Sequence, residues 1–423
     1  MHVDSILINA NQLVTCASDT PKRGDAMRDV GIIENGAMAI HDGKIQAIAT
    51  TDDILANYTS DHIIDAQNKA VCPGFVDPHT HVCYAGDRVD EFEMRIQGKS
   101  YMEIMAQGGG ILSSTQSIRA ASIDDLVEQT VQRLNAMSKL GTTTVEIKTG
   151  YGLDTQNELK MCHAIDKLNQ TCQHKMNIIP TFMGAHATPP EYKDTPDQYV
   201  DLVITDMIPK VAEWFKTTVW HNTNYPLFID VFCEQNAFTV DQSRRILEAG
   251  QALGMKVKAH VDEFTSLGGV KMAIELGATS IDHLDATTPE DIKILAESNT
   301  IGVVIPAVNF NLGSTEFANA RLMIDETVAL ALTTDINPGS APCPSMQFVM
   351  AIATRYQHLL PSEALNASTI NAAYAIGMGD QIGSLQVGKW ADFLILDTHD
   401  YRHLAYQFGG NLVSDVYKGG KHL

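Results

Sequence analysis

Residues 122–147, SIDDLVEQTVQRLNAMSKLGTTTVEI, hold the pattern that decides the fold of this chain. Ser122 followed by Asp125 matches a capping box, in which side chains and backbone at a helix start satisfy each other's hydrogen bonds. Apolar residues then recur at helical spacing as far as Leu140-Gly141, where glycine favours the end of a helix. Residues 143–147 follow as a short apolar run. The stretch therefore predicts a helix, a stop and a buried strand.

The same helix-Leu-Gly-strand unit occurs twice more, with Leu253-Gly254 before residues 257–260 and Leu276-Gly277 before residues 280–283. Repeated units of this kind are typical of a parallel sheet covered by helices. Eight candidate strands can be counted, near Phe75, Val145, Ile179, Ile229, Val257, Ile281, Val303 and Leu330. Eight parallel strands with helices between them predict an α/β fold, the TIM (β/α)8 barrel.

Both ends of the chain have β character instead. Residues 37–41 and 44–48 flank Asp42-Gly43, a strong hairpin signal because glycine tolerates a positive φ. Residues 391–396 form an apolar run near the other end. We therefore expect a small composite β-sandwich domain made from both ends. The expected boundaries are 1–70 for its first part, 71–382 for the barrel and 383–423 for its second part.

Composition excludes several classes of function. The net charge of -21 argues against nucleic-acid binding, which needs a basic surface. The seven cysteines show no CxxC spacing and indicate reduced thiols. No run approaches the roughly 18 apolar residues of a membrane span, and the first residues do not resemble a signal peptide. We expect a cytoplasmic protein with neither nucleic acid nor membrane as a partner.

A His-x-His pair, His79-Thr80-His81, follows the apolar run 70–78. Side chains two apart on a strand point to one face, so both imidazoles can address one metal ion. His260, His283 and Asp335 end other predicted strands, where barrel enzymes place their chemistry. Imidazoles with one carboxylate suit zinc or iron. We expect His79, His81, His260 and Asp335 to be the ligands, and His283 to lie beside the metal, binding substrate or carrying a proton.

Several stretches resemble a known family. Residues 73–81, PGFVDPHTH, and 388–393, GKWADF, are similar to the amidohydrolase superfamily. Other stretches resemble, more specifically, its imidazolonepropionase family: residues 86–88, 91–93, 97–101, 108–111, 146–152, 184–187, 335–340 and 408–413. The resemblance runs essentially from end to end.

This resemblance implies a metal-dependent hydrolase of histidine degradation. The reaction would open the cyclic amide C–N bond of 4-imidazolone-5-propanoate to give N-formimidoyl-L-glutamate, with metal-activated water attacking the ring carbonyl. The family's ligands map onto the four residues chosen above. Residues 228–234 carry no lysine that could bridge a second ion, so one divalent ion, zinc or iron, is implied. Glu263, His283 and Asp335 are the implied catalytic residues, and which of them is the main base stays open.

The substrate's propionate arm requires a cation, and Arg88 can hold a carboxylate through two parallel hydrogen bonds. The resemblance implies further substrate contacts from Tyr101, Tyr151, His186, Glu263, Asn337, Gly339 and Ser340. Residues 108–110, three glycines, are interpreted as an active-site loop. The expected partner is a small anionic substrate, and the family favours a homodimer.

Two other functions stay open on the sequence. One is a deaminase acting on a purine, pyrimidine or guanidino-type ring, and the other is a barrel that has lost catalysis. Residues 305–312 are more polar than the aromatic-rich form associated with the family, which leaves the pocket shape and substrate range open, particularly around Asn309-Phe310-Asn311.

Overall fold

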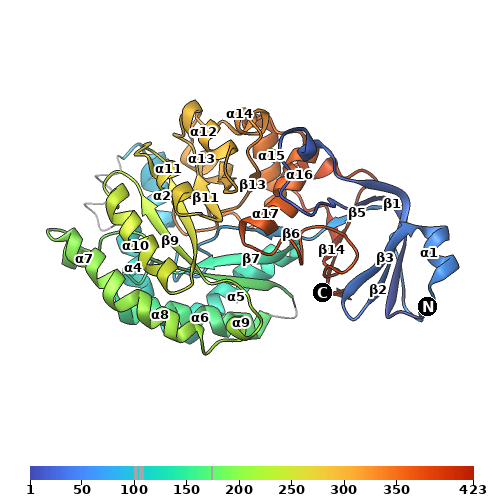
Figure 1. The fold of residues 1–423 in the computed structure, drawn as a ribbon, viewed down its shortest axis with the longest axis horizontal. Helices are drawn as coiled ribbons and strands as arrows, with labels where there is room; N and C mark the ends of the chain where they lie inside the picture. Colours follow the sequence, from blue (N-terminus) through green and yellow to red (C-terminus); the bar gives the residue numbers. More distant parts are fainter. Residues whose placement is uncertain (100–102, 104–108, 173–174) are drawn as a thin grey trace.

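A computed structural model describes residues 1–99, 103, 109–172 and 175–423. The chain forms a large barrel surrounded by helices and, beside it, a smaller sheet near which both termini lie (Figure 1). Among the described residues, no helix is long and apolar enough to cross a membrane. The seven cysteines are free thiols.

Eight strands form the barrel sheet in chain order, and each neighbouring pair is parallel. All eight predicted strand positions are confirmed: β6 (Phe75–Asp77), β7 (Thr142–Lys148), β8 (Asn177–Ala185), β9 (Phe228–Cys233), β10 (Lys256–Val261), β11 (Ser280–His283), β12 (Ile301–Val304) and β13 (Leu330–Leu332). The first strand and the segment after the last strand meet at Asp77, the last residue of β6, whose carboxylate accepts hydrogen bonds from the Thr333 hydroxyl and the Thr334 amide. The TIM barrel is confirmed.

Helices cover the outside of this barrel (Figure 1). They are α2 (Val89–Ile96), α4 (Ile111–Ala120), α5 (Ile123–Lys139), α6 (Thr155–Cys172), α7 (Pro196–Leu202), α8 (Ile208–Phe215), α9 (Val219–Asn222), α10 (Val240–Ala252), α11 (Gly269–Glu275), α12 (Pro289–Ala296), α13 (Pro306–Leu312), α14 (Ala320–Asp325), α15 (Met346–Tyr356), α16 (Pro361–Ala367), α17 (Ile370–Ala375) and α18 (His403–Tyr406). Short 3-10 turns lie at Gly24–Arg28 and Pro190–Tyr192, and a π-helix, Val203–Met207, joins α7 to α8.

The unit that decides the fold forms as predicted. Ser122 caps α5, its hydroxyl accepting a hydrogen bond from the Asp125 amide while the Asp125 carboxylate accepts one from the Ser122 amide. Leu140 ends the helix and Gly141 follows with a φ of 102°. Gly254 and Gly277 likewise have positive φ after α10 and α11. Glycine is favoured there because it adopts this conformation without steric cost.

The small domain combines strands from both ends of the chain, as predicted. Its sheet runs β16-β15-β14-β5-β1-β2-β3, with β4 paired to β1. The strands are β1 (Ser5–Val14), β2 (Ile32–His41), β3 (Lys44–Thr50), β4 (Ile63–Asp65), β5 (Ala70–Pro73), β14 (Phe393–Leu396), β15 (Val413–Lys418) and β16 (Lys421–His422), with α1 (Thr51–Asn57) after β3. The start of β3 bridges to Trp390, so the sheet curls over an apolar cluster that includes Met38, Ile45 and Phe393.

The junction between the domains lies between β5 and β6. β5 pairs with β1 and β14 in the small sheet, and Phe75 begins the barrel after Gly74. A Cβ at Gly74 would lie 2.3 Å from Oγ1 of Thr143, so the chain passes closely against β7 there. We propose Gly74 as the boundary between the two domains.

Candidate metal centre

Four donor atoms from three parts of the barrel meet at the carboxyl ends of its strands. Nε2 of His79 lies 3.5 Å from Oδ1 of Asp335, and Nε2 of His81 lies 3.9 Å from the same oxygen. Nε2 of His81 also lies 3.2 Å from Nε2 of His260. All four side chains are buried. The four residues predicted as ligands are thus adjacent in space.

Two of these donor atoms have no hydrogen-bond partner in the part of the chain that the structure describes. Nε2 of His79 and Oδ1 of Asp335 are buried without one. An unsatisfied buried polar atom is costly, so such a pair marks a place where another group binds. Nitrogen and oxygen donors at this spacing are the ligands that a divalent transition-metal ion takes in proteins. The residues present therefore fit a divalent metal ion.

Buried carboxylates orient two of the imidazoles. Nδ1 of His79 lies 2.7 Å from Oδ2 of Asp282, and Nδ1 of His260 lies 3.0 Å from Oδ1 of Asp230. A ring nitrogen that donates to a carboxylate carries the proton, which leaves Nε2 with a free lone pair. Asp282 and Asp230 therefore fix the tautomer that metal binding requires.

A buried lysine connects these carboxylates. Nζ of Lys148 lies 2.7 Å from Asp230, 2.7 Å from Glu146 and 3.8 Å from Asp282. Burial works against the ammonium charge, but the Asp230 and Glu146 carboxylates outweigh it and raise the pKa of Lys148. Burial likewise opposes the charge of Asp230, whereas His260 and Lys148 hold its pKa well below the usual range. Lys148 thus stays charged and compensates the buried acids.

Four buried residues of this centre are not predicted from the sequence as functional: Asp230, Asp282, Glu146 and Lys148. One signal was present. Two short apolar strands each contain a charged residue, Asp230 in residues 229–231 and Asp282 in residues 281–283. Such residues are rarely buried without a partner.

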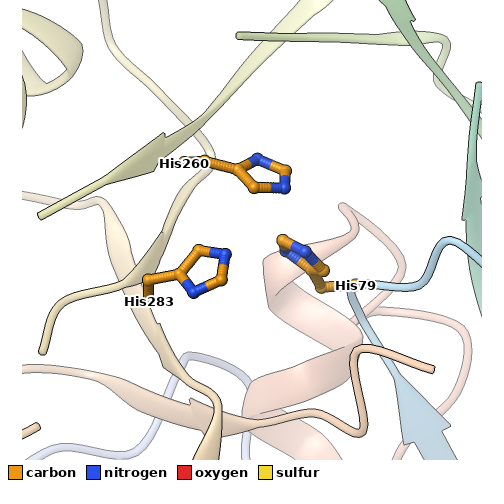
Figure 2. Close-up of side chains that lie close together, drawn as sticks. All are labelled: His79, His260 and His283. Atoms are coloured by element: carbon orange, nitrogen blue, oxygen red, sulfur yellow. The ribbon is translucent and has the colours of Figure 1, made fainter. Parts of the chain in front are cut away.

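His283 faces His79 and His260 across the centre (Figure 2). The donor atoms of these three residues all lie within 4.8 Å of one another. Nε2 of His283 lies 3.7 Å from Oε2 of Glu263. Burial, with the charge of His260, lowers the pKa of His283 well below the usual range, so its ring is neutral. Burial and the nearby Asp335 charge raise the pKa of Glu263 well above its usual range.

Asp335 and His283 both have left-handed backbone. Their φ values are 47° and 86°, and neither residue is glycine. Residues with side chains pay a conformational cost there, and such strain concentrates at functional sites. Asp335 follows β13 and His283 ends β11, and both contribute a donor atom to the groups at this centre.

Tyr151 and His186 line the side of the centre next to His81. The His186 ring stacks on His81 with centroids 4.7 Å apart, and the Tyr151 ring lies 5.3 Å from that of His186. Nδ1 of His186 lies 3.0 Å from the Gly150 carbonyl and so donates to it. Burial, with the charge of His260, lowers the pKa of His186 to about 3, so the neutral ring leaves Nε2 as an acceptor.

Arg88 packs against the loop after β13. Its Nη2 donates to Glu91 Oε2 at 2.6 Å, while its buried Nε has no hydrogen-bond partner among the described residues. A Cβ at Gly339 would lie 2.2 Å from Nη1 of Arg88, so only glycine leaves room for the guanidinium.

Asn337 organises that loop. Its Oδ1 accepts hydrogen bonds from the amides of Gly339 and Ser340, and its Nδ2 donates to the Asp335 carbonyl. The Ser340 carbonyl in turn accepts from Nδ2 of Asn311, in α13. The polar character of residues 309–311 is thus partly explained, because Asn311 ties α13 to the loop. Tyr101 and Gly108, also named from the sequence, lie outside the described residues.

Comparisons with known proteins show the family of this chain. A model of the amidohydrolase family matches residues 70–423. The chain belongs to the amidohydrolase family. This membership and the buried His and Asp group together indicate a divalent metal ion.

Similar proteins in this family share one name. The chain is 50% identical to the imidazolonepropionase of Chloroflexus aggregans, over 99% of this chain and 98% of that protein. It is 50% identical to the imidazolonepropionase of Herpetosiphon aurantiacus, over 99% and 97%, and 44% identical to that of Geobacillus kaustophilus, over 97% and 96%.

Solved structures confirm the fold of this amidohydrolase. An adenosine deaminase from Xanthomonas campestris with bound Zn superposes with a TM-score of 0.73 at 19% identity, covering 100% of this chain and 93% of that one. E. coli guanine deaminase gives 0.68 at 16% identity, covering 99% of each chain.

Proposed function

We propose that this amidohydrolase is a hydrolase that opens the ring of 4-imidazolone-5-propanoate to give N-formimidoyl-L-glutamate. Water adds to the ring carbonyl carbon, and the bond from that carbon to the ring nitrogen breaks. The nitrogen gains a proton and the carbonyl becomes a carboxylate. The observation that carries the proposal is the 50% identity, over nearly the whole of both chains, to a relative named imidazolonepropionase.

His79, His81, His260 and Asp335 would hold one ion, zinc or iron. A divalent ion bound there supplies Lewis acidity, which lowers the pKa of a coordinated water towards neutrality. The lysine on the buried side, Lys148, is engaged with Glu146 and Asp230, which supports a single ion in place of a lysine-bridged pair.

Glu263 and His283 would handle the proton and the carbonyl. Burial and the Asp335 charge raise the pKa of Glu263, which favours its protonated form, and Glu263 would deliver a proton to the departing ring nitrogen. His283 is neutral, and its Nδ1 is buried without a partner. One of its ring nitrogens can therefore donate a hydrogen bond to the developing oxyanion.

The rest of the substrate would lie between His186, Tyr151 and Arg88. The Tyr151 ring lies beside His81, with ring centroids 5.7 Å apart, and would contact the substrate on that side of the centre. The unpartnered Nε of Arg88 suits one oxygen of a carboxylate.

The direct test is an assay of purified, metal-loaded protein with 4-imidazolone-5-propanoate. The expected result is one N-formimidoyl-L-glutamate per substrate consumed and no ammonia. Ammonia release with a deaminated ring would establish a deaminase, and absence of any turnover would contradict the proposal.

A further inference from the structure

Two guanidinium groups converge on Gly339. Nη2 of Arg95 donates to the Gly339 carbonyl at 3.0 Å, and Nη1 of Arg88 occupies the space that a Cβ of Gly339 would fill. Arg88 is the N-cap of α2 and Arg95 lies in its last turn. Residues seven apart lie on one face of a helix, so α2 presents both side chains to the same loop.

Only one carboxylate oxygen of Glu91, which lies between Arg88 and Arg95 in the sequence, is bound by arginine. Oε2 of Glu91, also on α2, accepts a hydrogen bond from Nη2 of Arg88 at 2.6 Å. Its Oε1 accepts one from the Gly110 amide at 3.0 Å. A guanidinium has five N–H donors. Among the described residues, Arg95 uses one of them on the Gly339 carbonyl. Burial and the nearby charge of Arg88 lower the pKa of Arg95, and the charge of Glu91 partly opposes this. An anion between the two arginines would relieve that repulsion.

This pair of arginines is connected to the metal centre. Gly339 lies four residues after Asp335, and the Asn337 side chain ties together the Asp335 carbonyl and the Gly339 amide. The position of Gly339 relative to the centre is therefore fixed by covalent and hydrogen bonds.

We propose that Arg95 is a second substrate-binding guanidinium, which together with Arg88 forms a two-arginine site for the carboxylate of the propionate arm. The inference rests on the proposed function, because that function defines the anionic arm. It assigns to Arg95 a role in selecting anionic over neutral substrates, which no similarity noted above gives it. A role only as a support for the Gly339 loop is the competing explanation.

Binding of a ligand that cannot be hydrolysed separates these explanations. The probes are imidazole-4-propionate and its neutral amide, titrated by calorimetry into metal-loaded wild type, Arg95→Gln and Arg95→Lys. Arg244→Gln serves as the control, because Arg244 lies on α10 and pairs with Glu275 on the surface. Metal content is measured in every variant.

The expected result for Arg95→Gln is a propionate Kd about tenfold higher than in wild type, with the amide Kd changed less than twofold and metal content unchanged. The propionate Kd of Arg95→Lys should lie between those of wild type and Arg95→Gln, since lysine keeps the charge but lacks the planar guanidinium group. Arg244→Gln should match wild type.

An unchanged propionate Kd in Arg95→Gln would overturn the inference. So would an equal loss of affinity for the amide, which would assign Arg95 to loop support. Failure of the proposed function looks different: wild type would bind the propionate through Arg95 yet leave 4-imidazolone-5-propanoate intact. Wild type that binds neither probe would contradict both.

Discussion

The orientation of the His260 ring is set by contacts at both of its nitrogen atoms. Its Nδ1 is held by Asp230 while its Nε2 faces His81 at 3.2 Å, so the ring has one orientation and one free lone pair. Asp335 reaches the same point only through a backbone with a φ of 47°. Each residue is constrained by its neighbours, and each contributes one donor atom.

Replacing His260 should therefore remove the metal. For His260→Ala we expect the metal-to-protein ratio, measured by atomic emission, to fall from about one to well below a tenth, because a site with one ligand fewer binds far more weakly. His163→Ala, on α6, is the matched control. A His260→Ala protein that retains a full equivalent of metal would remove His260 from the ligand set.

Glu263 should affect turnover without affecting metal content. Glu263→Gln keeps the shape of the side chain but cannot donate an acidic proton, so we expect kcat to fall about 100-fold or more, the range of general acid–base catalysis. Measuring kcat and metal content on one preparation checks this. Near-normal turnover would limit Glu263 to ring binding or structure.

At the scale of elements, the three Leu-Gly helix ends differ in what surrounds them. A Cβ at Gly141 would lie 2.8 Å from Cδ1 of Leu394 and 2.9 Å from Cε2 of Phe75, whereas a Cβ at Gly254 would meet nothing within 4 Å. Leu394 belongs to β14 and Phe75 to β6. Gly141 thus lies where the end of α5 packs against both the barrel and the small domain.

Substituting alanine at Gly141 and Gly254 should separate the cost of backbone strain from the cost of overpacking. Gly254→Ala should cost roughly 1–2 kcal/mol of unfolding free energy, because alanine is strained at its φ of 88°. Gly141→Ala should cost roughly 1–3 kcal/mol more from overpacking. Thermal melts of the two variants measure the difference, and equal melting temperatures would mean that Leu394 and Phe75 yield freely.

The sequence was sufficient to predict the strands of the barrel and the site residues that lie at strand ends. Periodicity, caps and Leu-Gly stops predict the eight strands, and His79 and His260 follow from their places after two of them. Asp230 and Lys148 could not be assigned in this way. Their roles depend on partners from neighbouring strands, and a single sequence does not show which inward-facing residues meet across a barrel. The placement of Arg95 against Gly339 likewise depends on how α2 packs.

At the scale of the whole molecule, Lys389 supports the segment that leads from the barrel into the small domain. Its Nζ donates to the Gly379 carbonyl at 2.6 Å and to the Ser384 hydroxyl at 2.7 Å. Burial lowers the pKa of Lys389 from 10.5 to about 8. Between these values the unfolded chain binds more protons at Lys389 than the folded chain does, so this group's contribution to stability rises with pH.

Lys389→Met should remove that dependence. We expect the stability of wild type relative to Lys389→Met to increase as the pH is raised from 7.5 to 10, measured as the difference between their denaturation midpoints at each pH. A difference that stays constant, or that shrinks, would show that Lys389 has the same pKa in both states or a raised one.

The central claim is that one metal ion, held by four buried side chains, is required for ring opening. Its most direct test is to remove metal with a chelator and titrate zinc, and in a parallel titration ferrous iron, back into the protein while following hydrolysis of 4-imidazolone-5-propanoate. We expect no turnover without metal, and activity that rises linearly and saturates at one ion per chain for the active metal. Full activity in the metal-free protein, or saturation only at two ions per chain, would contradict it.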